Sequence, residues 1–243
     1  MFSPGRREVL SRSRILAGVL LIGYCFAQEN ATAVGQQSPS NKQINVNWIY
    51  GAYVPKDVVL EPLTNEGRWR LYLRQTYTTP GIYVKTILFT THDQIRNSPS
   101  EWGDGIEGYA KRVGSRQAQF VIQNSLSAAG NAVAGWEPRY DRCRCDGFWP
   151  RTRHAIFRNF VTYDRTEKAL RPQLFSYAAA FGGAAIAATW YPGNPNVLVK
   201  GYQGAITQVA VGIGVNWLAE FAPEITRVVR RKKAPDNSLK SDK

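Results

Sequence analysis

Apolar residues recur about every 3.6 positions in the segments 98–135 and 151–164, which is the spacing of an amphipathic helix. The alternation with period two that marks a half-buried strand is not sustained over any long segment. The helical patterns lie at residues 65–78, 80–97, 98–135, 151–164, 174–191 and 202–229. The sequence therefore predicts a mainly α fold, a single bundle-like domain of about five to six helices over residues 60–230.

Local signals indicate where three of these helices begin. Thr64 precedes the first helical segment, where a threonine hydroxyl can accept hydrogen bonds from free backbone N–H groups. Pro80 stands at the start of the second segment, a position that tolerates proline because the N–H there has no helical partner. Ser98 and Ser100 are the expected caps of the long third helix.

The last two helical segments predict a hairpin. The segment 174–191 has 18 residues and no charge, and the turn sequence Pro-Gly-Asn-Pro-Asn at 192–196 separates it from the segment 202–229. Small residues recur about every four positions and predict close helix packing. They are Ala179, Gly183 and Ala187 on the first helix, and Ala205 and Gly212 on the second.

Two environments remain open for this hairpin. One is the interior of a soluble helical bundle, and the other is a lipid bilayer. Gln203, Gln208 and Asn216 make the second helix poor as a lone membrane span. In either environment we expect Gly183 to be the most size-sensitive position of the chain, because the helix that carries Ala205 and Gly212 would press against it.

The first 33 residues have the pattern of an export signal. Four arginines (Arg6, Arg7, Arg12 and Arg14) precede an apolar run at 15–27, and small residues follow. The run is shorter than the roughly 20 residues of a membrane span. Cleavage after Ala27 or Ala33 is expected, with an uncleaved anchor as the alternative. The segment 6–10 also fits a twin-arginine address, whereas Tyr24 before Cys25 argues against lipidation.

The remaining polar segments and the charge suggest where the protein acts. Residues 34–59 are predicted to be a flexible or extended linker, and residues 231–243 a basic disordered tail. The 243 residues carry a net charge of +13, which favours anionic partners. Because an exported protein rarely meets nucleic acid, we expect an anionic membrane surface or an envelope polymer as the partner.

Residues 136–150 form a segment rich in charged residues, aromatic rings, proline and cysteine. We interpret it as a structural corner between two helices, held by ion pairs and covered by rings. Its principal residues are Glu137, Pro138, Arg139, Tyr140, Trp149 and Arg151. Cys143 and Cys145 can form a tight disulfide, pair between molecules, or join His92 or His154 at a metal. Their spacing matches no standard zinc site, so no metal and no cofactor is expected.

Catalytic motifs are largely missing from the sequence. There is no G-x-S-x-G, no H-E-x-x-H and no phosphate-binding glycine loop. Asp104 and Glu107 are three residues apart and can act as paired carboxylates in glycan hydrolysis. Their alternative role is to stabilise a helix N-terminus through its dipole. An enzyme is therefore the less favoured interpretation.

Several motifs resemble those of a family of exported bacterial proteins without an assigned activity. They are W-G-x-G-x-x-G-Y-x-K-R at residues 102–112, D/E-P-R-Y at 137–140, F-W-x-R at 148–151 and a W-Y-P turn at 190–192. The resemblance extends over about residues 60–226 and implies export and a helical fold, but supplies no catalytic residues. Glu137 replaces the usual aspartate, and the Cys-Arg-Cys insert is atypical.

These features together predict an exported cell-envelope protein. The favoured function is non-enzymatic, at or in a membrane, with the small-residue hairpin as the packing core. The alternative is a periplasmic enzyme that acts on an envelope polymer, with Asp104, Glu107 and the Arg/Asp corner lining a cleft. A carboxylate pair that converges with His154 in one pocket would favour the enzyme, whereas an uncharged belt about 30 Å tall would favour the membrane protein.

Overall fold

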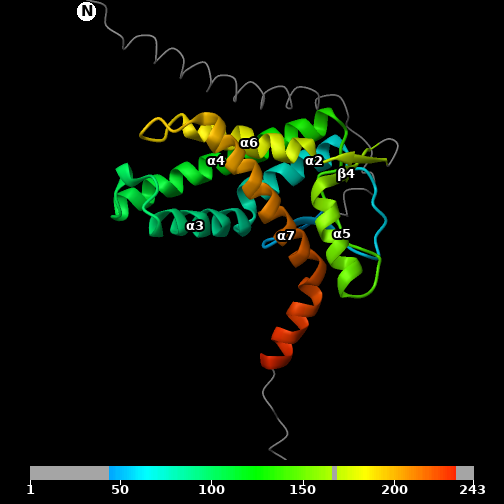
Figure 1. Cartoon of the computed structure of the whole chain (residues 1–243). Coiled ribbons are helices and arrows are strands. Elements are labelled where there is room, and N and C mark those ends of the chain that lie inside the picture. The colour runs from blue at the N-terminus through cyan, green and yellow to red at the C-terminus, as the bar shows by residue number, and fades with distance from the viewer. Residues whose placement is uncertain (1–43, 166–168, 234–243) are drawn as a thin grey trace, which may run out of the picture. The chain divides into compact units, whose positions relative to one another are not determined.

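The computed structural model describes residues 44–165 and 169–233 (Figure 1). The chain divides into two units, Met1–Pro39 and Ser40–Lys243, and every described residue belongs to the second. The predicted export signal at 1–33 lies outside the described residues. So does the predicted tail beyond residue 233, although the segment 231–233 is still helical.

Helices dominate the described part, which confirms the predicted mainly α fold. The α-helices are α2 (Asn65–Leu73), α3 (Pro80–Ile95), α4 (Ile106–Val133), α5 (Phe148–Phe160), α6 (Leu174–Ala188) and α7 (Val197–Lys233). A π-helical turn, η2 (Arg74–Thr78), continues α2, and a 3-10 turn, η3 (Ser100–Trp102), precedes α4. Six α-helices in this region agree with the number expected from the sequence.

Two of the predicted helix starts are confirmed and the third is wrong. The Thr64 hydroxyl accepts the backbone N–H of Gly67 at 3.1 Å, and Pro80 opens α3. However, α4 begins at Ile106 rather than near Ser98, because the chain first turns through η3 and then adopts a left-handed conformation at Gly103 (φ 72°). A serine cap therefore has no helix to cap there.

The loop between α3 and α4 is held by one buried arginine. Arg112 is 1% exposed, and its guanidinium donates to the backbone carbonyls of Ser98, Pro99 and Gly103 at 2.6–3.0 Å. It also donates to the side chain of Gln94 at 2.7 Å. Because a buried guanidinium needs acceptors for its N–H groups, the arginine of the G-Y-x-K-R motif fixes this loop.

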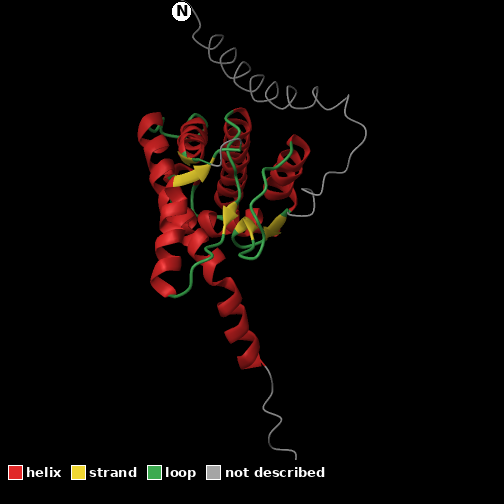
Figure 2. Ribbon diagram, turned by 90° about the vertical axis from the view of Figure 1, so that its right-hand side faces the viewer, coloured by secondary structure: helices red, strands yellow, loops and turns green. Residues whose placement is uncertain are grey.

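Short strands connect the helices (Figure 2). In one sheet β2 (Gly51–Val54) pairs antiparallel with β1 (Asn45–Asn47) and parallel with β3 (Tyr140–Asp141). In the other, β4 (Val161–Tyr163) pairs antiparallel with β5 (Leu170–Pro172).

These strands correct two predictions. Residues 45–54, expected to be a flexible or extended linker, do include the extended strands β1 and β2, but they are part of the folded unit, since Ala52 and Val54 of β2 are buried. The helix expected at 151–164 ends at Phe160 because the chain enters β4, where β-branched Val161 and Thr162 favour a strand. Each strand has at most four residues, too few for a period of two to be recognised.

Helix α6 packs against both α4 and α7 (Figure 1). Seven of its fifteen residues are buried, and each of them is alanine or glycine: Ala179, Ala180, Gly183, Ala184, Ala185, Ala187 and Ala188. The small side chains leave room for neighbouring helices to approach closely. The predicted hairpin of consecutive helices is thus present, and α6 also has a second neighbour, α4.

The contacts of Gly183 differ from the prediction that the helix bearing Ala205 and Gly212 presses against it. A Cβ atom on Gly183 would lie 3.1 Å from Cβ of Gln123 and 3.3 Å from the carbonyl oxygen of Gln119, so α4 and not α7 presses on this position. The contact between α6 and α7 instead uses Gly204, where a Cβ would lie 2.6 Å from both the carbonyl oxygen of Ala180 and the Cβ of Ala184.

The other predicted packing residues of α7 have separate environments. Gly212 contacts the side chain of Asn159 on α5, and Ala205 is partly buried. The segment Val197–Val228 of α7 is long and apolar enough to cross a membrane, and only 11% of its most apolar window is buried. Half of the residues in this segment are exposed, and the others are partly or fully buried.

We predict that Gly204→Ala destabilises the protein, because the new methyl group would overlap backbone and side-chain atoms of α6, at a cost of about 1–3 kcal/mol. Gly214 is the matched control on the same helix, because a Cβ atom there would have nothing within 4 Å. Gly214→Ala should stabilise by up to about 1 kcal/mol through helix propensity. Urea unfolding of both variants measures this difference, and equal stability would contradict the packing described for α6 and α7.

Candidate functional site

The corner at residues 136–150 leads from the end of α4 to the start of α5 and contains a buried ion pair. Nε of Arg139 donates to Oε1 of Glu137 at 2.7 Å, and Nη2 donates to Oε2 at 3.1 Å. Glu137 is 4% and Arg139 2% exposed. Nη2 of Arg139 also donates to the carbonyl of Glu61 at 2.5 Å. The pair therefore ties the corner to the chain just before α2.

The aromatic residues of the corner only partly cover the core. Tyr140 is buried, and the ring of Trp136 packs on Phe175 with 4.9 Å between centroids. Trp149, which we expected to shield the core, is 76% exposed, and Phe148 is half exposed. Both residues lie on the first turn of α5, where the Phe148 ring packs against Phe221 of α7. The indole of Trp149 therefore faces outward.

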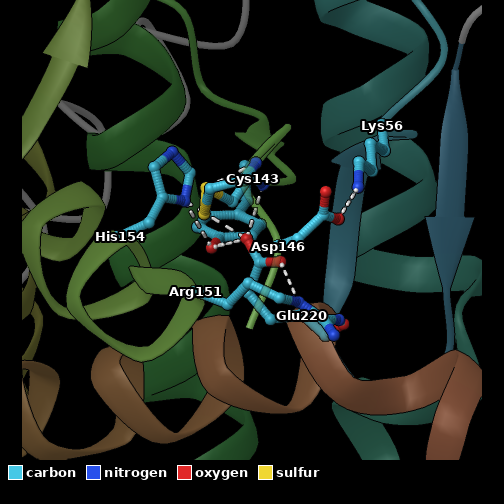
Figure 3. The surroundings of a disulfide bond; sticks show 8 residues. Lys56, Cys143, Asp146, Arg151, His154 and Glu220 are labelled. Carbon is cyan, nitrogen blue, oxygen red and sulfur yellow. Dashed lines mark hydrogen bonds and ion pairs between the residues drawn. A yellow bond between two sulfur atoms is a disulfide. The ribbon is translucent and has the colours of Figure 1, made fainter. Parts of the chain in front are cut away.

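Glu220 of α7 completes the corner and was not predicted. It is 1% exposed, and its Oε1 accepts a hydrogen bond from the Tyr140 hydroxyl at 2.5 Å and from the Cys143 backbone N–H at 2.7 Å. Figure 3 shows His154 of α5 beside this carboxylate, with Nδ1 3.2 Å from Oε1. Arg151 donates to the backbone carbonyl of Glu220 and to Oε1 of Glu224, the latter at 2.8 Å.

The environment of Glu220 favours its charged form. Burial by itself would raise the pKa of this carboxyl, but the hydrogen bonds from His154, Tyr140 and the Cys143 N–H outweigh it and lower the pKa. Burial and the neighbouring carboxylate raise the pKa of the Tyr140 hydroxyl. A carboxylate with a low pKa is a weak general base near neutral pH. The cluster is therefore better suited to hold the corner than to transfer protons.

Cys143 and Cys145 form a disulfide with each other, with 5.2 Å between their Cα atoms. Of the states left open by the sequence, the structure has the intramolecular bridge. In this state neither sulfur is a thiolate, the form that binds metal. In the two described stretches of chain, no group of three or more His, Cys, Asp or Glu residues could hold a metal ion. Nδ1 of His92 instead lies 3.8 Å from Oδ1 of its neighbour Asp93.

The predicted carboxylate pair does not converge on this corner. Asp104 is exposed, and the Glu107 side chain is 81% exposed and forms an ion pair with Lys111 at 2.6 Å. His154 instead faces Glu220. The two acids lie around the start of α4, where a helix favours negative charge. This arrangement lacks the carboxylates flanking one cleft that glycan hydrolysis requires.

One side of the corner borders a polar cavity of about 270 Å³. Glu137, Pro138, Arg139 and Tyr140 all line it, together with residues from α2, η2, α4, α5, α6 and α7. The structural corner of the sequence analysis is therefore also one wall of an internal space, which sequence patterns alone did not indicate.

No protein-family model, curated protein or solved structure matches this chain.

We predict that Glu220→Gln destabilises the protein at pH 7 by about 1–3 kcal/mol, because the Arg151 and His154 side chains lose a charged neighbour and the Tyr140 and Cys143 hydrogen bonds weaken. Since the pKa of Glu220 is lower than its ordinary 4.5 in the folded state, its stabilisation is full above the unfolded pKa and disappears as the pH falls through the folded pKa. As the pH falls below 4.5, the free energy of unfolding of Glu220→Gln should therefore decrease less than that of the wild type.

Glu224→Gln is the matched control, one helical turn further along α7 and also paired with Arg151. Its carboxylate is 48% exposed, so the substitution should cost about 1 kcal/mol or less. Thermal unfolding of the three proteins between acidic and neutral pH distinguishes these effects. Identical pH profiles for the wild type and Glu220→Gln would contradict the role given to Glu220.

Proposed function

We propose that this chain is an exported cell-envelope protein that acts without catalysis at an anionic membrane surface. The main support for this proposal is the exposed apolar face of α7. Near the start of the helix five large apolar residues are 42–69% exposed: Val197, Leu198, Val199, Tyr202 and Ile206. A contiguous patch of this kind is typical of an interaction site on a soluble surface.

The opposite face of α7 packs against the rest of the folded unit. Gly204 packs on α6, and Nε2 of Gln208 donates to the Ser176 hydroxyl at 3.2 Å. Further along, Glu220 is buried against the corner. Because these contacts hold one face of α7 inside the folded unit, they favour a helix that lies on the membrane with its other face over one that spans it.

The charge of the chain supports an anionic surface as the partner. From Arg227 onward the sequence has seven basic residues and two acidic ones. A basic residue near an anionic leaflet contributes about 1 kcal/mol of attraction. The signal pattern at 1–33 and the resemblance to exported proteins are consistent with a place in the cell envelope, where both anionic lipids and anionic polymers occur.

The alternative function, an enzyme on an envelope polymer, has weaker support. It rested on Asp104 and Glu107 sharing a cleft with His154, and these side chains have separate environments in the described residues. The well-ordered carboxylate of the corner, Glu220, is held by donors that lower its pKa. We therefore retain the non-enzymatic interpretation.

We predict that the protein floats with vesicles that contain phosphatidylglycerol but much less with pure phosphatidylcholine vesicles. Ile206→Asp should reduce flotation severalfold, because a charge at the centre of the apolar patch opposes burial in the interface. Val133→Asp is the matched control, since Val133 is 86% exposed at the far end of α4 and outside the patch.

The control variant should float like the wild type. A wild type that remains with the soluble fraction in both vesicle types would reject the membrane proposal. An equal loss of flotation in Ile206→Asp and Val133→Asp would reject the role of the α7 patch and leave only a general electrostatic attraction.

A further inference from the structure

The polar cavity beside the corner has features of a binding site for a small molecule. Its volume of about 270 Å³ is close to the lower end of the range for ligand pockets, roughly 300–1,000 Å³. It lies where α2, η2, α4, α5, α6 and α7 meet the corner, and residues of all six helical elements line it. The size suits a molecule no larger than a simple sugar derivative.

The walls of this cavity are polar, whereas most small-molecule pockets are lined mainly by apolar side chains. Amides and hydroxyls from three helices, α4, α6 and α7, face it. They include Asn124, Ser127, Asn131, Ser176, Gln208 and Asn216. Several of these groups already bond one another: Nδ2 of Asn131 donates to the Ser127 hydroxyl, and Nε2 of Gln208 donates to the Ser176 hydroxyl. A lipid or another apolar molecule would still desolvate this polar wall without offering hydrogen bonds in return, which is costly. The lining therefore favours a ligand that has several hydroxyl or oxyanion groups.

Three of the lining residues have buried polar atoms without a hydrogen-bond partner. Arg68 donates through Nη1 to the carbonyls of Asn131 and Trp136, but its Nε and Nη2 have no acceptor. Thr76 is 0% exposed and its hydroxyl is unpartnered, as is Oε1 of Gln173. Unpaired buried polar atoms are uncommon in folded proteins, and four of the seven found in the described residues belong to these three lining residues.

The backbone that presents Thr76 is itself unusual. Thr76 and its neighbour Gln75 lie in the π-helical turn η2, which interrupts the regular α-helical hydrogen bonding after Leu73. Such π-helical turns occur frequently at functional sites. The turn therefore gives a second reason, independent of the unpaired atoms, to assign a ligand to this cavity.

The charge balance of the cavity favours an anion. Three arginines line it, and two of them have carboxylate partners: Arg139 pairs with Glu137, and Arg158 with Asp141. Arg68 forms no ion pair with a carboxylate in the part of the chain that the structure describes. Its free Nε and Nη2 groups form the fork that binds two oxygens of a carboxylate or phosphate.

We infer that this cavity binds a small hydroxylated oxyanion, such as a sugar acid or a sugar phosphate. The oxyanion accepts hydrogen bonds from Nε and Nη2 of Arg68. Hydroxyl groups of the ligand pair with the Thr76 hydroxyl and donate to Oε1 of Gln173. The inference is independent of membrane binding, because the lining of the cavity includes none of the exposed residues of the α7 patch.

The test uses the full chain and four probes: glucuronate, a glucose phosphate, uncharged glucose and acetate. Isothermal titration and thermal shift should detect binding of glucuronate or the glucose phosphate, which distinguishes the two sources of the oxyanion. Glucose lacks the anion and acetate lacks the hydroxyls, so both should bind more weakly. Arg68→Lys keeps the charge but loses the planar fork, and it should weaken binding about tenfold or more.

Thr76→Val is the more specific variant because it replaces an unpartnered hydroxyl by a methyl group of similar size. It should raise the melting temperature of the free protein and weaken binding of the probe about threefold to tenfold. Thr90→Val is its matched control. Thr90 is also 0% exposed with an unpartnered hydroxyl, but it lies on α3 and does not line the cavity. It should raise the melting temperature and leave binding unchanged.

Failure of both anionic probes to bind at millimolar concentration would overturn the inference and indicate that water fills the cavity. Equal affinities for glucose and glucuronate would overturn the assignment of an anion. Unchanged probe affinity in Thr76→Val, or a loss of the same size in Thr90→Val, would place the binding site elsewhere.

Discussion

The close approach of α4 and α7 to α6 is the constraint on which the rest of the structure depends. The buried residues of α6 are all alanine or glycine, so the backbones of its neighbours come near it. Gly183 meets α4, and Gly204 meets the backbone of α6 near Ala180. Packing through backbone contact tolerates little added volume, because a new methyl group would lie 3.3 Å from a backbone oxygen of α4 at Gly183 and 2.6 Å from one of α6 at Gly204.

This packing has a consequence for the polar groups. With small side chains at the helix contacts, several of the largest buried side chains are charged, among them Arg112, Arg139 and Glu220. Each makes hydrogen bonds that fix a loop or corner: Arg112 the turn before α4, and Glu220 the corner before α5. A buried charge that loses its partner is strongly destabilising, so these groups fix one arrangement of the connecting segments.

The polar cavity and the apolar patch follow from the same arrangement. Where α2, α4, α5, α6 and α7 meet the corner, polar side chains surround a space instead of filling it. Meanwhile α7 uses one face for α6 and the corner, and leaves its apolar residues near Ile206 exposed. One helix thus contributes both to the cavity and to the apolar patch. We propose separate functions for the two within a single folded unit.

The sequence could predict the helices because their signals are local. The cap at Thr64 and the proline at Pro80 act within one turn, and the apolar spacing indicates the amphipathic helices α4 and α5. The prediction for Gly183 was wrong in rank and in neighbour. A Cβ atom there would lie 3.1 Å from its nearest neighbour, on α4, whereas a Cβ atom on Gly204 would lie only 2.6 Å from atoms of α6. A stripe of small residues identifies neither the tightest contact nor the helix that faces it.

The candidate site was predicted only in part. The corner residues Glu137 and Arg139 are close in sequence, and their pairing could be expected. Glu220 is 80 residues from Tyr140, and its only sequence signal is a single carboxylate in an otherwise apolar stretch of helix. The cavity has no local signal, because its lining residues come from six helical elements, the corner, the strands β2 and β4, and the loops beside them. Contacts between distant segments depend on the tertiary fold, which the spacing of residues along one segment does not determine.

Native-state hydrogen exchange of the backbone amides tests the central claim, that α6 is enclosed by α4 and α7, most directly. Amides in closely packed helices exchange only on large-scale unfolding, whereas amides in exposed helical turns exchange through local opening. The account predicts that residues 179–188 of α6 exchange most slowly and that residues 197–206 of α7 exchange much faster. Exchange of α6 as fast as that of residues 197–206 would contradict the packing on which this account depends.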